Sequence, residues 1–190
     1  FSKMKSVYGL VKTLNYVKNL IYKDSAAPFK LKHLTYHAYV NPERYQSFVV
    51  NKKSGKKRLI HSPNKGLLPI QKCLNLVLQV VYESHQRSCA TGFIPGKSIV
   101  DNAKKHVGKN YVYNLDLKDF FPSIDQARIW GRLQHPPFNL NKENKKLQIA
   151  QVIASLCFQS MEVERLDENG NWIKVEKDVL PQGAPTSPIL

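Results

Sequence analysis

The chain has 190 residues, 42% of them apolar, which is enough for one or two compact units that each bury an ordinary core. Its 29 Lys and Arg outnumber 14 Asp and Glu, and the formal net charge of +15 favours a polyanionic partner, with nucleic acid first and an anionic membrane surface second. No apolar run approaches the roughly 18 to 20 residues that span a bilayer, so we expect no membrane segment and a cytoplasmic location.

Hydrophobic periodicity predicts two long helices in the N-terminal half. Apolar residues recur at i, i+3, i+4 and i+7 from Val7 to Tyr22 and again, with more apolar neighbours, from Leu67 to Tyr82. Between them, residues 29–46 mix basic and aromatic types without a firm period, which indicates short helices and turns. The segments Phe-Val-Val at 48–50 and Arg-Leu-Ile at 58–60 flank a lysine-rich connection that contains Gly55, and this pattern predicts a hairpin with a cationic tip.

The C-terminal half mixes short helices with extended segments. We expect a polar helix over 101–106, a helix that Ser123 caps and that runs toward Leu133, and an amphipathic helix over 142–158. A hairpin over 161–179 should turn at 167–171. This irregular mixture favours the α+β class over a doubly wound sheet.

The segment 111–117 alternates and predicts a strand. Its odd-numbered residues would share a buried face, so that Asp116 projects from the opposite face at the end of the strand. A lone aspartate at such a place usually caps the following turn. Nucleotidyl transfer, however, needs a carboxylate on a rigid element to carry one or two magnesium ions (Mg²⁺), so Asp116 is a candidate catalytic residue.

Two strings carry a family resemblance. Residues 116–121, Asp-Leu-Lys-Asp-Phe-Phe, resemble motif A of reverse transcriptases, and residues 180–188, Leu-Pro-Gln-Gly-Ala-Pro-Thr-Ser-Pro, resemble motif B. The resemblance implies the fingers and upper palm of a right-hand polymerase, divided into 1–90 (N-terminal helices and fingers), 91–134 (upper palm with motif A), 135–181 (fingers helix and hairpin) and 182–190 (start of motif B). The Tyr-x-Asp-Asp segment that completes such a site is absent, so we expect a fragment that is inactive by itself.

In motif A the resemblance implies that Asp116 and the Leu117 carbonyl hold Mg²⁺. The backbone near Asp119 and Phe120 would contact the triphosphate. Phe121 would lie under the sugar and exclude a 2′-hydroxyl, and its alternative reading is a core aromatic.

In motif B, Gln182 would contact the incoming deoxynucleoside triphosphate, and Gly183 would let the template backbone approach closely. The alternative reading is an ordinary Pro- and Gly-rich loop. The charged tip at 52–58 would usually be a solvated turn. Placed before motif A, it resembles the fingers hairpin, in which Arg58 and a lysine, Lys53 ahead of Lys52, clamp the triphosphate.

Residues 92–98 do not form a P-loop, because that motif requires glycine where this chain has Thr91. They resemble the second conserved block of group II intron and retron reverse transcriptases, in which Lys97 would hold a template phosphate. The pattern Asn-Ala-x-x-His, with Asn102 and His106, resembles an element that marks bacterial retron enzymes. A lone histidine on a polar helix is otherwise simply solvated.

The resemblance therefore implies a retron-type RNA-directed DNA polymerase with an RNA template and a DNA product. Family membership alone would add a role in phage defence and an effector protein partner. Three alternatives stay open: a group II intron maturase, a defence reverse transcriptase that makes untemplated DNA, and a non-catalytic RNA-binding scaffold.

Overall fold

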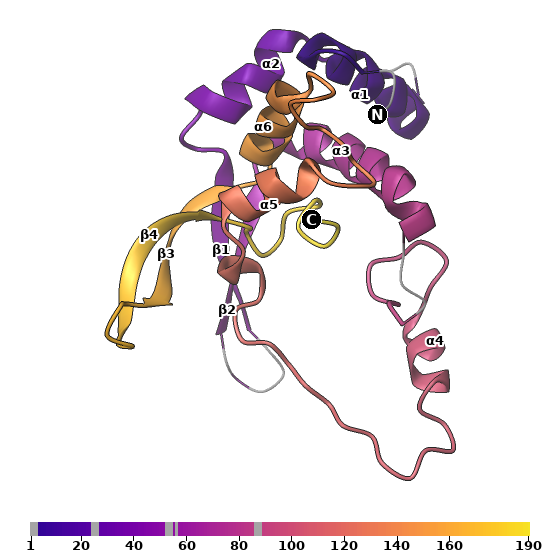
Figure 1. The fold of residues 1–190 in the computed structure, drawn as a ribbon, viewed down its shortest axis with the longest axis vertical. Coiled ribbons are helices and arrows are strands. Elements are labelled where there is room, and N and C mark those ends of the chain that lie inside the picture. The colour runs from indigo at the N-terminus through magenta and orange to yellow at the C-terminus, as the bar shows by residue number, and fades with distance from the viewer. Residues whose placement is uncertain (1–3, 24–26, 52–54, 56, 86–88) are drawn as a thin grey trace.

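The computed structural model describes residues 4–23, 27–51, 55, 57–85 and 89–190. Helices α1, α2, α3 and α6 form the upper part of the molecule in Figure 1, and two β-hairpins and α4 extend from it. The elements in chain order are α1 (Val7–Tyr22), α2 (Leu31–Thr35), the π-helical turn η2 (Tyr36–Val40), β1 (Tyr45–Asn51), β2 (Lys57–Pro63), α3 (Leu67–Tyr82), the 3₁₀ turn η3 (Glu83–His85), α4 (Ile99–Lys104), the 3₁₀ turn η4 (Phe121–Ser123), α5 (Gln126–Leu133), α6 (Leu147–Leu156), β3 (Gln159–Leu166) and β4 (Trp172–Val179).

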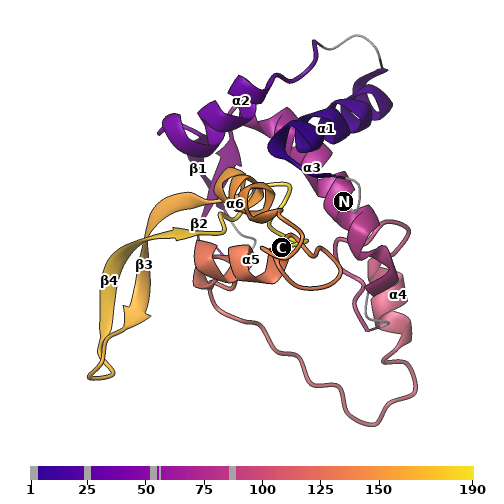
Figure 2. The same cartoon turned by 45° about the horizontal axis from the view of Figure 1, so that its top comes forward.

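The two long predicted helices are confirmed. The Ser6 side chain caps α1 by accepting a hydrogen bond from the Gly9 amide at 3.4 Å. The apolar stripe of α1, with Leu10 and Leu14 at its centre, is buried against α3, and the stripe of α3 lies in the same core. In Figure 2, α1 crosses α3, with which it is in contact, and α2 lies beside them.

A buried glutamine ties this helical core to the first hairpin. Gln71 on α3 is fully buried, and its Nε2 donates to the Tyr45 hydroxyl of β1 at 2.6 Å and to the Leu156 carbonyl at the end of α6 at 2.8 Å. Burial raises the pKa of Tyr45 well above its ordinary range, so the hydroxyl stays protonated. These bonds fix where β1 and β2 leave the core.

Both predicted hairpins are confirmed, and with them the α+β class. β1 pairs antiparallel with β2 from Tyr45 opposite Pro63 to Asn51 opposite Lys57. β3 pairs antiparallel with β4, and the Asp167 carboxylate closes their turn by accepting hydrogen bonds from the amides of Asn169 and Asn171 at 2.9 and 2.8 Å. The turn therefore lies where the sequence predicts it.

The strand predicted over 111–117 is not present. A strand forms only by hydrogen bonding to a neighbour, and the sheets of the described residues pair β1 with β2 and β3 with β4 alone. The face expected to be buried is open to solvent, with Tyr111, Tyr113, Leu115 and Leu117 94%, 85%, 74% and 67% exposed. The segment is instead an extended link between α4 and the motif A turn (Figure 1).

Three helix boundaries also differ from prediction. α4 starts earlier, at Ile99, because Ser98 and Asp101 form a reciprocal capping box. Asp125, not Ser123, precedes α5, since the Ser123 hydroxyl donates to the Phe120 carbonyl at 2.6 Å inside η4. The predicted helix over 142–158 is shortened to α6, after a turn in which Asn139 and Lys145 adopt positive φ. In the described part of the chain, no helix is both long and apolar enough to cross a bilayer.

Candidate active site

Motif A forms a tight turn at the end of the extended link. Asp119 adopts a left-handed conformation with φ of 49°, which aspartate tolerates better than most residues. Its carbonyl accepts a hydrogen bond from the Ser123 amide at 3.0 Å, which closes η4. The backbone therefore turns directly after Asp116 and Leu117, and Phe121 packs against the core.

Asp116 itself is exposed at the edge of this turn. Among the described residues, no hydrogen bond or ion pair occupies its carboxylate or the Leu117 carbonyl, and both oxygens are hard donors of the kind that Mg²⁺ prefers. Next to them, Lys118 Nζ lies 3.2 Å from Glu164 Oε2 of β3. No group of three His, Cys, Asp or Glu side chains within the described ranges could hold a metal, so Asp116 would supply only part of a metal site.

Motif B is joined to motif A through the backbone. The Leu180 amide donates to the Ile124 carbonyl at 3.1 Å, and Asp125 forms a bridge with Val179. Within motif B, the Ser187 hydroxyl donates to the Pro181 carbonyl at 2.7 Å and folds the loop on itself. Backbone hydrogen bonds therefore hold the segment after motif A against the start of motif B, although the two motifs are about 60 residues apart in sequence.

Motif B also lies against the first hairpin. The His61 amide of β2 donates to the Gln182 carbonyl at 2.8 Å. A Cβ placed on Gly183 would come within 2.6 Å of Ile60 Cγ2 and 3.0 Å of the His61 carbonyl, and Gly183 has φ of 120°. The glycine thus permits close contact between motif B and β2.

Arg58 lies on the face of β2 that motif B covers. Side chains alternate along a strand, so Arg58 and Ile60 project on the same side, and Ile60 is the residue that meets Gly183. Arg58 is exposed. Lys53, the predicted partner of Arg58, lies outside the described residues, as does Lys52.

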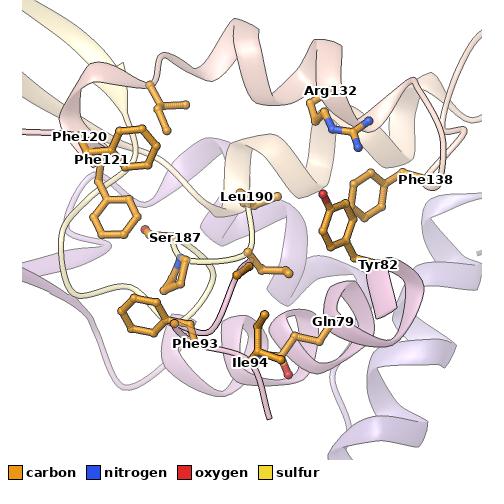
Figure 3. Close-up of a pocket in the computed structure, with 15 residues that line it drawn as sticks. Gln79, Tyr82, Phe93, Ile94, Phe120, Phe121, Arg132, Phe138, Ser187 and Leu190 are labelled. Atoms are coloured by element: carbon orange, nitrogen blue, oxygen red, sulfur yellow. The ribbon is translucent and has the colours of Figure 1, made fainter. Parts of the chain in front are cut away.

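A cavity of about 330 Å³ lies between the two motifs (Figure 3). Figure 3 shows Phe121 and Ser187 on one side of it, with Phe93 and Ile94 approaching from the loop that precedes α4. Phe120 is half exposed, whereas Phe121 is partly buried and packs against the core, so the structure supports a core contact for Phe121 as well as a place beside the cavity. The residues that line the cavity are Gln79, Tyr82, Ala90, Gly92, Phe93, Ile94, Phe120, Phe121, Ile124, Arg132, Phe138, Ser187, Pro188, Ile189 and Leu190.

The remaining predicted residues lie apart from these contacts. Lys97 is exposed, and its amide donates to the carbonyl of Ile94, a cavity residue, at 3.1 Å. Asn102 and His106 are exposed in and just after α4, which Figure 1 shows away from α5 and both hairpins. Asp116 shares no described hydrogen bond or ion pair with Arg58 or Gln182, so its convergence with them stays a prediction.

Sequence reasoning did not identify two residues that position the motifs. Arg165 of β3 donates to the Pro122 carbonyl at 2.8 Å and forms an ion pair with Asp125 at 2.7 Å, which braces the end of motif A. His61 is 7% exposed, its Nδ1 lies 2.8 Å from the Ser47 hydroxyl, and burial lowers its pKa. No local pattern distinguishes either residue, because each acts through a partner distant in sequence.

Comparison with known proteins agrees with this geometry. Residues 50–190 match the family model described as reverse transcriptase (RNA-dependent DNA polymerase). The chain belongs to the reverse transcriptase family. It is 37% identical to the retron Mx65 reverse transcriptase of Myxococcus xanthus over 84% of this chain and 36% of that protein. It is 29% identical to the retron Ec86 reverse transcriptase of Escherichia coli over 92% of this chain and 47% of that protein.

The retron Mx162 reverse transcriptase of Myxococcus xanthus is 33% identical over 84% of the chain and 31% of that relative. The predicted resemblance to retron-type reverse transcriptases is therefore confirmed at the level of sequence. This reverse transcriptase chain spans about a third to a half of the length of these curated relatives.

Proposed function

We propose that the whole protein is a retron-type RNA-directed DNA polymerase, which extends DNA on an RNA template with deoxynucleoside triphosphates. The main support is the backbone connection of three elements: the Gln182 carbonyl accepts a hydrogen bond from β2, and the Leu180 amide donates one to Ile124, three residues after motif A. We infer from this connection that a cationic strand, a glutamine loop and a carboxylate turn face one region. Polymerase chemistry needs these groups together, since catalysis there consists of positioning and charge stabilisation.

Each residue has a proposed role in this scheme. Arg58, with Lys53, binds the triphosphate, and its planar guanidinium suits bidentate contact with phosphate oxygens. Gln182 contacts the nucleotide, and the turn at Asp119 and Phe120 meets its phosphates. Phe121 limits space at the sugar.

Lys97 and Gly183 are proposed to contact the template, and Asn102 and His106 are markers of the subfamily. The assignment of 1–90 and 135–181 to fingers and of 91–134 and 182–190 to palm belongs to the same proposal.

Reverse transcriptases generally use divalent metal ions, and we propose Mg²⁺ here. Asp116 and the Leu117 carbonyl fit this ion because both are oxygen donors at an exposed turn, and further carboxylates must complete the site. When bound, the metal would lower the pKa of the attacking hydroxyl and neutralise phosphate charge. The proposed part of the chain itself is to position Asp116 relative to motif B through η4 and the hydrogen bond from Leu180 to Ile124.

Finer features of the proposal rest on the family resemblance. They are a template that is the protein's own non-coding RNA, a role in phage defence, an effector protein partner and a cytoplasmic site of action, where template RNA and nucleotides are found. The high positive charge of this chain supports the nucleic-acid part of this scheme.

The proposal is tested with Asp116→Ala in the whole protein. We expect primer extension with Mg²⁺ to fall by about a thousandfold or more, because a metal ligand supplies several kcal/mol of transition-state stabilisation. RNA affinity should change by less than about twofold, since it depends mainly on phosphate contacts. The matched control is Glu168→Ala, which removes an exposed carboxylate in the β3–β4 turn.

The 190-residue chain alone serves as a second arm and should give no extension, because its described residues hold no group of three metal-ligating side chains. Extension by the Asp116→Ala protein at the wild-type rate would refute the proposed function.

A further inference from the structure

A second hollow, of about 650 Å³, lies between α1, α2 with η2, and the start of α3. Its lining shares no residue with the cavity between the motifs. Its apolar surface comes from Pro28 and Phe29 before α2 and from Pro69 and Ile70 of α3. We name it the N-terminal pocket, and its lining comprises Lys18, Ala27, Pro28, Phe29, Lys32, His33, Tyr36, His37, Lys65, Gly66, Pro69 and Ile70.

The charged groups of the N-terminal pocket are all cationic. No carboxylate is among its lining residues. Lys18 is already used within the fold, because its Nζ donates to the Ala27 carbonyl and lies 4.0 Å from the centre of the Phe29 ring. Lys32 and Lys65 are exposed and take part in no salt bridge of the described structure, so they are available to an anion at the rim.

An aromatic ring stands at the same rim. Tyr36 is 48% exposed and begins the π-helical turn η2, a geometry that is frequent at functional sites. Its ring meets His37 edge-on, with centroids 5.3 Å apart, and this contact restricts its orientation. One face of Tyr36 can therefore receive another flat ring.

His37, beside Tyr36 in η2, supplies a hydrogen-bond donor to the wall of the pocket. The Asn41 amide lies 3.4 Å from His37 Nδ1 and can only donate there, so the neutral ring has its proton on Nε2. Burial, followed by the nearby Arg44 and His33, lowers the pKa of His37 and keeps it neutral near pH 7. A Cβ on Gly66 would lie 2.7 Å from Nε2, so this wall is open only because residue 66 is glycine.

We propose that the N-terminal pocket binds one unpaired nucleotide of RNA. The base stacks on Tyr36 over the apolar floor, and Lys32 and Lys65 hold the flanking phosphates. A free phosphate would leave the floor uncovered, and a lipid headgroup would leave the aromatic ring unused. The inference deepens the proposed function, since it places a part of the polymerase's RNA outside the active site.

The test uses the whole protein and a fluorescent single-stranded RNA of about ten nucleotides, with affinity measured at several salt concentrations. The double variant Lys32→Ala with Lys65→Ala should flatten the slope of log affinity against log salt by about 1.4, because two phosphate contacts to single-stranded RNA are lost. Tyr36→Ala should weaken binding by roughly tenfold without changing the slope.

Matched controls remove the same groups elsewhere. Lys12→Ala with Lys72→Ala removes two exposed lysines outside the pocket, and Tyr16→Ala removes a tyrosine that is 69% exposed on α1. The charge-conserving Lys32→Arg with Lys65→Arg should keep the wild-type slope. Thermal unfolding of each protein shows that it is folded.

The proposal is overturned if both lysine pairs change the slope equally, or if Tyr36→Ala and Tyr16→Ala bind alike. It is also overturned if the pocket variants lose affinity for anionic vesicles or inorganic phosphate but not for RNA. Primer extension separates the two proposals: a wild-type protein that does not polymerise, yet shows the slope change, removes the proposed function and supports the pocket.

Discussion

At the scale of single residues, Gly183 leaves the least room for a Cβ atom among the described glycines. The family resemblance explains this glycine by close approach of the template. The structure adds a reason within the chain, because Ile60 and the His61 carbonyl occupy the space where a side chain would lie. Positive φ of 120° adds strain for any other residue. Gly183 thus sets how closely motif B and β2 approach.

Gly183→Ala should therefore destabilise the protein by about 1–3 kcal/mol, the usual cost of forcing extra atoms into a packed contact. It should also lower primer extension, because Gln182 is displaced from β2. Thermal unfolding and extension rates measure the two effects. The control is Gly131→Ala on α5, where a Cβ meets no atom within 4 Å and helix propensity predicts an unchanged or slightly higher stability.

If both alanine variants unfold at the wild-type temperature, the packing explanation of Gly183 is wrong.

At the scale of elements, the β3–β4 hairpin acts as a brace for motif A. Arg165 joins β3 to the Pro122 carbonyl and to Asp125, directly after η4. Its side chain is 27% exposed, so the ion pair itself contributes only about 1 kcal/mol or less to stability. Its larger effect should be on geometry, since it fixes the turn that carries Asp116 and Leu117.

Arg165→Ala in the whole protein should lower the rate of extension by about tenfold or more, because a small displacement of a catalytic group is costly. Stability should fall by only about 1 kcal/mol. Arg165→Lys should recover the rate in part, because lysine keeps the positive charge but lacks the guanidinium group that donates to two acceptors at once. Single-turnover rates and thermal unfolding measure the two effects separately.

The matched control is Lys174→Ala. It removes an exposed ion pair on the same hairpin, in which Lys174 Nζ lies 2.8 Å from Glu162 Oε1. An equal loss of rate in both variants would show that Arg165 acts through the hairpin as a whole and not on motif A.

At the scale of the whole molecule, two buried histidines make the stability of the folded state depend on pH. Burial lowers the pKa of both His37 and His61 below the ordinary value of 6.5. The unfolded chain therefore binds protons more readily than the folded one below pH 6.5. The contribution of the two neutral histidines to the free energy of unfolding is fully present above pH 6.5. It is lost progressively as the pH falls toward their lowered pKa values in the folded protein.

The thermal unfolding temperature should thus drop between pH 7 and pH 5, before aspartates begin to titrate. His61→Gln should flatten this dependence, because glutamine cannot be protonated, and the exposed His135→Gln should leave it unchanged. A wild-type unfolding temperature that is constant over this range would contradict the assignment of neutral buried histidines.

Local sequence signals determined much of the fold. Helical periodicity placed α1 and α3, and the Asp167 turn placed the β3–β4 hairpin, because these features depend on residues close together in the chain. The strings around Asp116 and Gln182 identified the family for the same reason, since a motif is a local pattern. The convergence of Asp116 and Gln182 on one triphosphate is a prediction from that resemblance.

Only the tertiary structure decided what depends on distant partners. Alternation at 111–117 predicted a strand, but a strand exists only beside a hydrogen-bonding neighbour, and the described sheets supply none there. The contact between Gly183 and Ile60 and the brace from Arg165 likewise join residues 40 or more positions apart. Periodicity is a property of a single segment, so it can be predicted from the sequence. Strand pairing and side-chain packing are properties of the folded chain, so they cannot be predicted from one segment.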